Sequence, residues 1–73
     1  MTLSRELYGR ILALMAEGLT DAEIARRLVL SRYTVGEYVK HICRELGARN
    51  RTHAVHRAHL VGIFTPNARG KQS

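Results

Sequence analysis

The chain has 73 residues, with 12 Lys or Arg, 6 Asp or Glu and a single Cys. This length suffices for one small domain, and a lone cysteine excludes an internal disulfide, so helix packing or oligomerisation has to stabilise the fold. No apolar run reaches the ~18 residues that span a bilayer, and the N-terminus lacks the basic-then-apolar order of a secretory signal. We therefore expect an intracellular protein without a membrane partner.

The net charge of +6 lies entirely in the second half of the chain. Residues 1–30 contain four Arg and four acidic residues, whereas residues 31–73 contain eight basic residues and two acidic ones. Such an asymmetric basic charge favours a polyanion as the partner, although a merely solubilising surface has the same composition.

The first two helices are predicted from apolar spacing and from the residues at their ends. An apolar stripe that starts at Leu7 predicts a helix over residues 4–17, and Gly18 follows at the position of a C-terminal glycine. Thr20 and Glu23 have the spacing of a capping box, so a second and shorter helix begins there and ends near residue 28.

The third helix is predicted to begin after Ser31, a good N-cap, and to end at Gly47. Its buried stripe repeats at i, i+4, i+7 and i+11 and consists of Val35, Val39, Ile42 and Leu46.

A fourth helix is predicted to start at residues 50–52, to include Phe64 in its apolar face and to stop at Pro66. Its inward-facing residues are expected to be Ala54, Val55, Ala58 and Val61. Residues 1–66 then form the domain, and residues 67–73 form a polar, disordered tail.

Residues 20–46 have the pattern of a helix-turn-helix, in which two helices are joined by a short turn. Ala25 supplies the small side chain that a close helix crossing needs, and Leu30 is placed to be buried under the turn. We therefore predict an all-α fold: a four-helix domain that contains a helix-turn-helix.

The face of the third helix opposite its buried stripe carries the candidate DNA contacts. A recognition helix reads base edges with its first turns and contacts phosphates around them, and the amides at its N-terminus also favour phosphate. Lys40 and Arg44, spaced i, i+4, lie on one side of the helix. The predicted DNA-binding residues are Ser31, Arg32, Tyr33, Thr34, Gly36, Glu37, Lys40, His41 and Arg44, with Arg49 and Arg51 before and at the start of the fourth helix.

The order of these features resembles the LuxR/GerE-type helix-turn-helix family. The resemblance is carried by residues 16–25, by Leu28-x-Leu30-Ser31-x-x-Thr34-Val35 and by residues 47–55. It implies a DNA-binding domain of the bacterial cytosol or nucleoid that recognises operators as a dimer. It also implies that the third helix enters the major groove and that the fourth helix forms the dimer contact. Gly36 stands where Lys is common in the family, and Tyr38 stands where His is common.

A homodimer is also predicted because the fourth helix has more apolar surface than one small core needs. The expected dimer residues are Val55, Ala58, His59, Leu60, Ile63 and Phe64.

Other kinds of site find little support in the sequence. His53, His56 and His59 recur at i, i+3 and i+6, so the outer two differ by about 120° around a helix, and we expect no metal site. Cys43 is expected to be a buried, inert thiol. Because no phosphate-binding glycine loop, Ser/His/Asp set or carboxylate pair stands out, we expect no cofactor and no enzymatic activity.

The predicted function is therefore that of a sequence-specific regulator of transcription that binds double-stranded DNA. Two alternatives remain open: a module that docks on RNA polymerase like a sigma-factor region, and an architectural DNA-binding protein without sequence preference. Met1 directly before the first helix, together with the polar tail, favours a stand-alone regulator over a domain excised from a longer one.

Overall fold

Short polar side chains determine where the helices begin. The computed structural model describes residues 4–62 and folds them into α1 (Arg5–Ala16), α2 (Asp21–Leu28), α3 (Arg32–Leu46) and α4 (Arg51–Leu60), which confirms the predicted all-α fold. Each helix is preceded by a residue whose side chain accepts a hydrogen bond from an amide in the first turn: Ser4, Thr20, Ser31 and Asn50.

The predicted capping box at the start of α2 is present. The Thr20 hydroxyl accepts from the Glu23 amide at 3.2 Å, and the Glu23 carboxylate accepts from the Thr20 amide at 2.8 Å. These bonds satisfy two of the amide groups that a helix start otherwise leaves without a partner. They also hold the pKa of the Glu23 carboxyl below its usual value.

The helix ends differ in the strain that they carry. Gly18 and Gly47 follow α1 and α3 with left-handed φ angles of 88° and 64°, which glycine adopts at little cost. The turn after α2 places Val29 in the same region, at φ 58°. The Leu30 amide then donates to the Ala25 carbonyl at 2.8 Å and closes the turn between the two helices. A β-branched residue in this conformation is strained.

The predicted end of the fourth helix was wrong. Within the described residues α4 ends at Leu60, where Val61 forms its C-cap and Gly62 takes a left-handed φ of 77°. A glycine in this conformation ends a helix without any need for the proline further along. Ile63, Phe64 and the predicted stop at Pro66 lie outside the described residues, as does the predicted tail.

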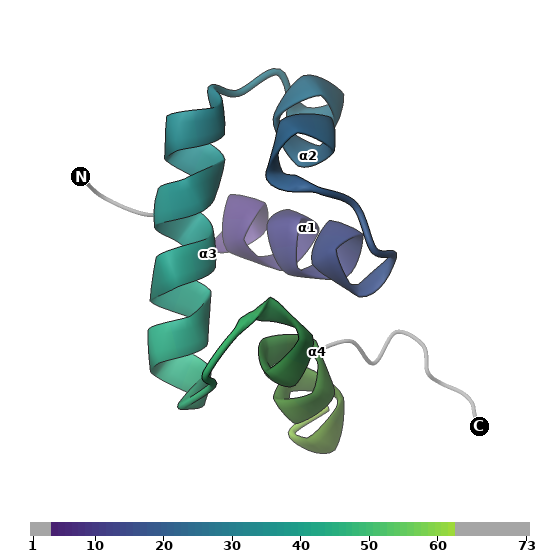
Figure 1. The fold of residues 1–73 in the computed structure, drawn as a ribbon, viewed down its shortest axis with the longest axis vertical. Helices are drawn as coiled ribbons and strands as arrows, with labels where there is room; N and C mark the ends of the chain where they lie inside the picture. Colours follow the sequence, from purple (N-terminus) through teal and green to yellow (C-terminus); the bar gives the residue numbers. More distant parts are fainter. Residues whose placement is uncertain (1–3, 63–73) are drawn as a thin grey trace.

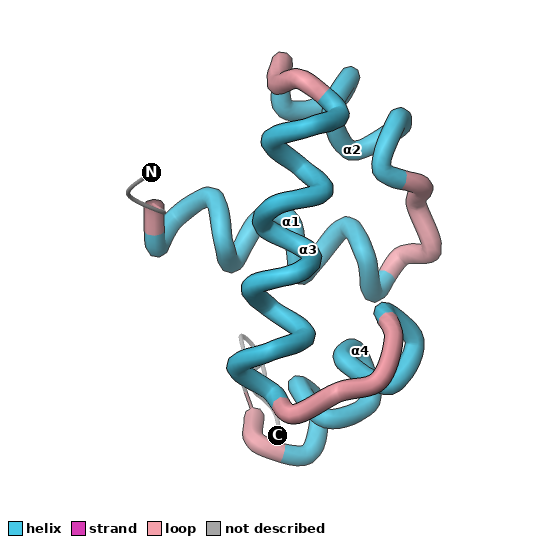
Figure 2. The backbone as a smooth tube through the Cα atoms, turned by 60° about the vertical axis from the view of Figure 1, so that its left-hand side comes forward, coloured by secondary structure: helices cyan, strands magenta, loops and turns pink. Residues whose placement is uncertain are grey.

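The arrangement of the helices leaves one side of α3 uncovered. Helix α3 contacts each of the other three helices, which lie together on one side of it in Figure 1. Helix α2 lies beside the beginning of α3, α4 lies beside its end, and α1 crosses between them, as Figure 2 shows from another direction. The opposite side of α3 has no described helix against it.

The core lies where these helices meet. Its fully enclosed large side chains are Ile11, Leu12, Ile24, Val35 and Ile42, with Leu14, Met15, Ala25, Tyr38, Ala54 and Ala58 around them. Val39 and Leu46 of the predicted α3 stripe are only partly buried. Tyr38, which sequence analysis did not place in the core, is buried, and its hydroxyl accepts from the Ser4 amide at 2.8 Å.

Candidate nucleic-acid interface

The start of α3 is closed by a pair of hydroxyl side chains. The Ser31 hydroxyl accepts from the Thr34 amide at 3.0 Å and donates to the Thr34 hydroxyl at 2.9 Å. Arg32 and Tyr33 follow in the first turn, and both side chains are exposed. The first turn therefore presents a cation and an aromatic ring at the end of the helix where the macrodipole favours anions.

Two cations lie further along the uncovered side of α3. Lys40 and Arg44 are exposed, and four residues at about 100° per residue place them roughly 40° apart around the helix. The Lys40 ammonium lies 3.4 Å from the Glu37 carboxylate. An exposed pair of this kind contributes only about 0–1 kcal/mol, so a phosphate can compete with Glu37 for Lys40.

His41 lies on the flank of α3 that faces α1 rather than on its outermost side. Its ring packs edge-on against Tyr8, with the ring centroids 6.0 Å apart, and its Nε2 lies 3.1 Å from the Glu45 carboxylate. Burial, followed by a hydrogen bond to Glu45, raises the pKa of Tyr8 to about 12. His41 therefore links α1 to α3, a role that sequence analysis did not predict.

Gly36 has open space where a side chain would be. A Cβ atom built at this position meets no atom within 4 Å, and its backbone is that of an ordinary helix. The fold therefore does not require glycine here.

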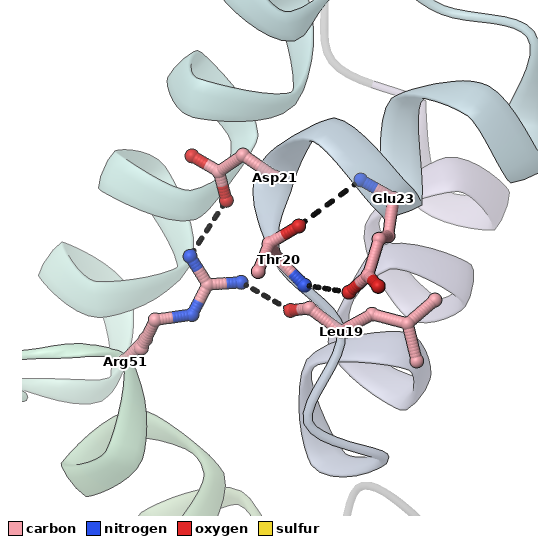
Figure 3. A network of polar contacts seen from close by, with 5 residues as sticks. All are labelled: Leu19, Thr20, Asp21, Glu23 and Arg51. Atoms are coloured by element: carbon pink, nitrogen blue, oxygen red, sulfur yellow. Dashed lines mark hydrogen bonds and ion pairs between the residues drawn. The ribbon is translucent and has the colours of Figure 1, made fainter.

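The two arginines near the start of the fourth helix have different surroundings. Arg49 is exposed in the loop between α3 and α4, where its amide donates to His53 Nδ1 at 3.1 Å. The Arg51 guanidinium instead binds the Asp21 carboxylate at 2.6 Å and the Leu19 carbonyl at 3.0 Å (Figure 3). Both partners belong to the chain itself, so Arg51 has an intramolecular role that sequence analysis did not predict.

The turn before α3 presents an apolar side chain to solvent. Val29 is 88% exposed, whereas Leu30 is partly buried against the core, as the prediction for the turn required. Ala25 is buried, in agreement with its predicted place at the crossing of α2 and α3.

The predicted dimer residues of α4 divide into two groups. Ala58 is wholly buried in the core of its own chain, which corrects its assignment to the dimer surface, and Val55 is partly buried. His59 and Leu60 are exposed, and Val61, which we expected to face inward, is 60% exposed. Val61 is exposed because the helix ends before it. Ile63 and Phe64 lie outside the described residues.

Sequence analysis also missed Arg57, whose Nε donates to the Leu46 carbonyl at the end of α3. A basic residue in the last turn of α4 gave no signal of a partner 11 positions earlier, because such a contact depends on the path of the loop. Cys43 is partly buried, not fully buried as predicted.

Two kinds of feature are absent from residues 4–62. No group of three or more His, Cys, Asp or Glu side chains is placed to hold a metal ion there. None of the helices in this part of the chain combines the length and the hydropathy that a bilayer-spanning helix needs.

Comparison with known protein families decides what this arrangement belongs to. Residues 3–58 match the model of the GerE domain, described as bacterial regulatory proteins of the luxR family. The chain belongs to this family. The predicted resemblance is therefore confirmed, and the chain is a luxR-family helix-turn-helix domain that binds DNA.

Two curated relatives of this luxR-family domain are regulators. The chain is 49% identical over 45 residues to the response regulator RamR of Streptomyces coelicolor, which covers 62% of this chain and 22% of RamR. It is 39% identical over 55 residues to the transcriptional repressor ThaA of Burkholderia thailandensis, which covers 75% of this chain and 23% of ThaA. The chain thus spans less than a quarter of either relative. The first is named as a response regulator and the second as a repressor of transcription.

Proposed function

We propose that this luxR-family domain recognises a specific sequence in double-stranded DNA by placing α3 in the major groove. The observation that carries the proposal is the one-sided packing of α3, whose covered side contacts three helices while its bare side presents Lys40 and Arg44. A helix anchored along one side and basic along the other fits the width and the charge of the groove. Because its proposed target is chromosomal DNA, we expect such a regulator to act in the bacterial cytosol.

The residues of the bare side divide by position. Tyr33, Gly36 and Glu37 lie in the first two turns, which reach base edges in other helix-turn-helix proteins. The cations are placed for phosphates: Arg32 at the start of α3, Lys40 and Arg44 further along it, and Arg49 in the following loop. The Ser31 hydroxyl, bonded to the Thr34 hydroxyl, holds the Thr34 amide of the first turn in position. His41 acts at the edge of this surface, through its contact with Tyr8.

The experiment compares Lys40→Ala and Arg44→Ala with Arg10→Ala as a control. Arg10 is an exposed cation that pairs with Glu6 on the solvent side of α1, so its removal changes the net charge equally but leaves α3 intact. We expect both α3 variants to weaken binding and to lower the salt slope by about one for each phosphate that is no longer bound. If all three variants bind a selected duplex as wild type does at every salt concentration, α3 is not the reading helix.

The same titration discriminates among the functional classes. A specific regulator should prefer its selected site over random duplex by about 10³-fold or more, whereas an architectural protein binds both alike. A polymerase-docking module would retain RNA polymerase on an affinity resin in the absence of DNA and would show little affinity for the duplex.

The domain is further proposed to act as a homodimer that pairs the C-terminal part of α4. Leu60 is 69% exposed and Val61 is 60% exposed, and such neighbouring apolar side chains favour a partner surface. A two-fold axis pairs the same patch on each chain and directs both α3 helices to one face of the duplex. Half-sites about 10 bp apart are expected from that geometry.

Leu60→Glu tests the dimer. We expect the wild type to bind as two chains per operator in sedimentation experiments, and the variant to bind more weakly and with less cooperativity. The patch is small beside a standard interface of ~800 Å² per partner, so the second chain is expected to join on the DNA rather than before it. A wild type that binds one chain per operator at every concentration contradicts the proposal.

A further inference from the structure

Arg51 joins two parts of the chain that are 30 or more residues apart in sequence. It is the first residue of α4, and its guanidinium lies between the Asp21 carboxylate in the first turn of α2 and the Leu19 carbonyl in the loop before it, as Figure 3 shows. The Nη1–Oδ1 distance is 2.6 Å and the Nη2–O distance is 3.0 Å. The side chains of Arg51 and Asp21 are 37% and 36% exposed, so water only partly screens the pair.

Two sets of hydrogen bonds stabilise the start of α2: the capping box within its first turn, and the contact with Arg51 of α4. Thr20 and Glu23 bond to each other across the first turn, so that their polar groups are already engaged. Arg51 donates to the Leu19 carbonyl, one residue before Thr20, and to the Asp21 carboxylate, one residue after it. A planar guanidinium can serve two acceptors at once in this way, which an ammonium group on a flexible stem does not do with the same geometry.

A second arginine attaches the other end of α4. Arg57 donates to the Leu46 carbonyl at the end of α3, six residues after Arg51 and about 9 Å further along the helix. Helix α4 is therefore held at two separate points, at the start of the helix-turn-helix by Arg51 and at the end of α3 by Arg57. Two separate attachments restrict rotation of α4 about either one.

We propose that Arg51 is a positioning residue for DNA recognition, which fixes the helix-turn-helix relative to α4 through Asp21 and Leu19. The inference rests on the proposed function, because α4 is the helix that we assign to the dimer. With α4 fixed to α2, the dimer axis and the recognition helix keep one distance and one orientation. This contact then adds to the direct packing of α4 against α3 in setting the half-site spacing that a dimer accepts.

The experiment uses Arg51→Gln, Asp21→Asn and the double variant, with Arg49→Gln as the matched control. Binding is measured on the selected operator over a range of salt concentrations, and on operators lengthened or shortened by one base pair between the half-sites. Asp21→Asn discriminates best between an effect of charge and an effect of positioning. Removing an acidic charge from a DNA-binding protein by itself favours the polyanion, whereas disruption of a positioning contact weakens binding.

We expect Arg51→Gln and Asp21→Asn each to lower operator affinity several-fold without a change in the salt slope. Both should reduce the preference for the correct half-site spacing. The double variant should bind the operator no more weakly than the single variant with the lower affinity. Arg49→Gln should lower the salt slope by about one, leave the spacing preference intact and add to the effect of Asp21→Asn. Arg51→Lys should fail to restore the spacing preference, because Lys keeps the charge but not the paired donors.

The opposite pattern overturns the proposal. If Arg51→Gln lowers the salt slope by about one, Arg51→Lys restores binding and Asp21→Asn binds as wild type, then Arg51 is a phosphate contact. Thermal melts of wild type, Arg51→Gln, Asp21→Asn and the double variant without DNA separate this outcome from failure of the proposed function. Independent, additive losses of Tm for the Asp21 and Arg51 variants would overturn the positioning contact whether or not the wild type prefers one duplex.

Discussion

Gly36→Ala should stabilise the domain, and the structure gives the magnitude. A glycine in a helix interior costs about 0.5–1 kcal/mol relative to alanine, because the unfolded glycine has more backbone freedom to lose. A Cβ at Gly36 meets no atom within 4 Å, so nothing offsets the gain. For a domain of this size, ~1 kcal/mol corresponds to an increase in Tm of roughly 4–8 °C.

Gly9→Ala is the matched control for this substitution. Gly9 also lies in a helix interior, in α1, is exposed, and a Cβ atom added there has no neighbouring atom within 4 Å. Both variants should therefore melt higher than wild type by a similar amount in circular dichroism. A Tm for Gly36→Ala that is equal to or below that of wild type would refute the conclusion that the position is unstrained and open.

The two variants should differ on DNA. A methyl group at Gly36 lies beside the proposed contact surface of α3, and we expect it to lower operator affinity despite the more stable fold. Gly9→Ala should bind as wild type. Equal affinity of both variants for the selected operator would place Gly36 outside the contact surface and identify its glycine as a tolerated weak point of the helix.

Three further substitutions test the packing around α3. Val29→Gly should raise Tm, because a left-handed φ costs a non-glycine residue about 1–2 kcal/mol and this side chain, 88% exposed, contributes little burial; a lower Tm would mean that Val29 packs on something the fold requires. Ala25→Leu should cost ~1–3 kcal/mol by overpacking the crossing of α2 and α3, and an unchanged Tm would show that the crossing has room. The raised pKa of Tyr8 means that the folded state favours the neutral phenol. Its contribution to the free energy of unfolding is therefore complete below pH ~10 and is lost as the pH rises towards about 12. Tyr8→Phe should lose less stability than wild type over that pH range in alkaline melts.

The helix starts were predictable because the interactions that fix them are local. Ser31 and Thr34, like Thr20 and Glu23, lie three residues apart, so the sequence itself contains both partners of each cap. The glycine after α3 was predictable for the same reason, because helices commonly end at a left-handed residue and glycine adopts that conformation at little cost.

The partners of long polar side chains were not predictable in this way. Arg51 has the sequence position of a phosphate contact, but the start of α4 lies near enough to the start of α2 for the guanidinium to reach Asp21, 30 residues earlier, at 2.6 Å. His41 had the correct helical phase for an outer face, yet the crossing of α1 put Tyr8 against its ring. Periodicity gives the direction of a side chain around its own helix, whereas its partner depends on how the other helices cross.

The basic residues divide into those bound within the chain and those proposed to contact DNA, and this division predicts the salt dependence of DNA binding. Arg51 and Arg57 have partners inside the chain, which leaves Arg32, Lys40, Arg44 and Arg49 as the proposed contacts in the described part of the protein. Four phosphate contacts in each of two chains give a slope of log K against log salt concentration of about −7, at about −0.9 per contact.

Departures from that slope have specific meanings. If Arg51 and Arg57 also reached phosphates, six contacts per chain would steepen the slope to about −11. If only one chain engaged the operator, four contacts would give about −4. Fluorescence anisotropy on a labelled operator between low and physiological salt resolves these values. A slope steeper than about −9 would mean either that the two α4 arginines contact phosphates or that a further cation does. Arg51→Gln, measured on the same operator, distinguishes these cases. Only if Arg51 contacts a phosphate does this variant make the slope less steep, which would refute its assignment to an internal contact.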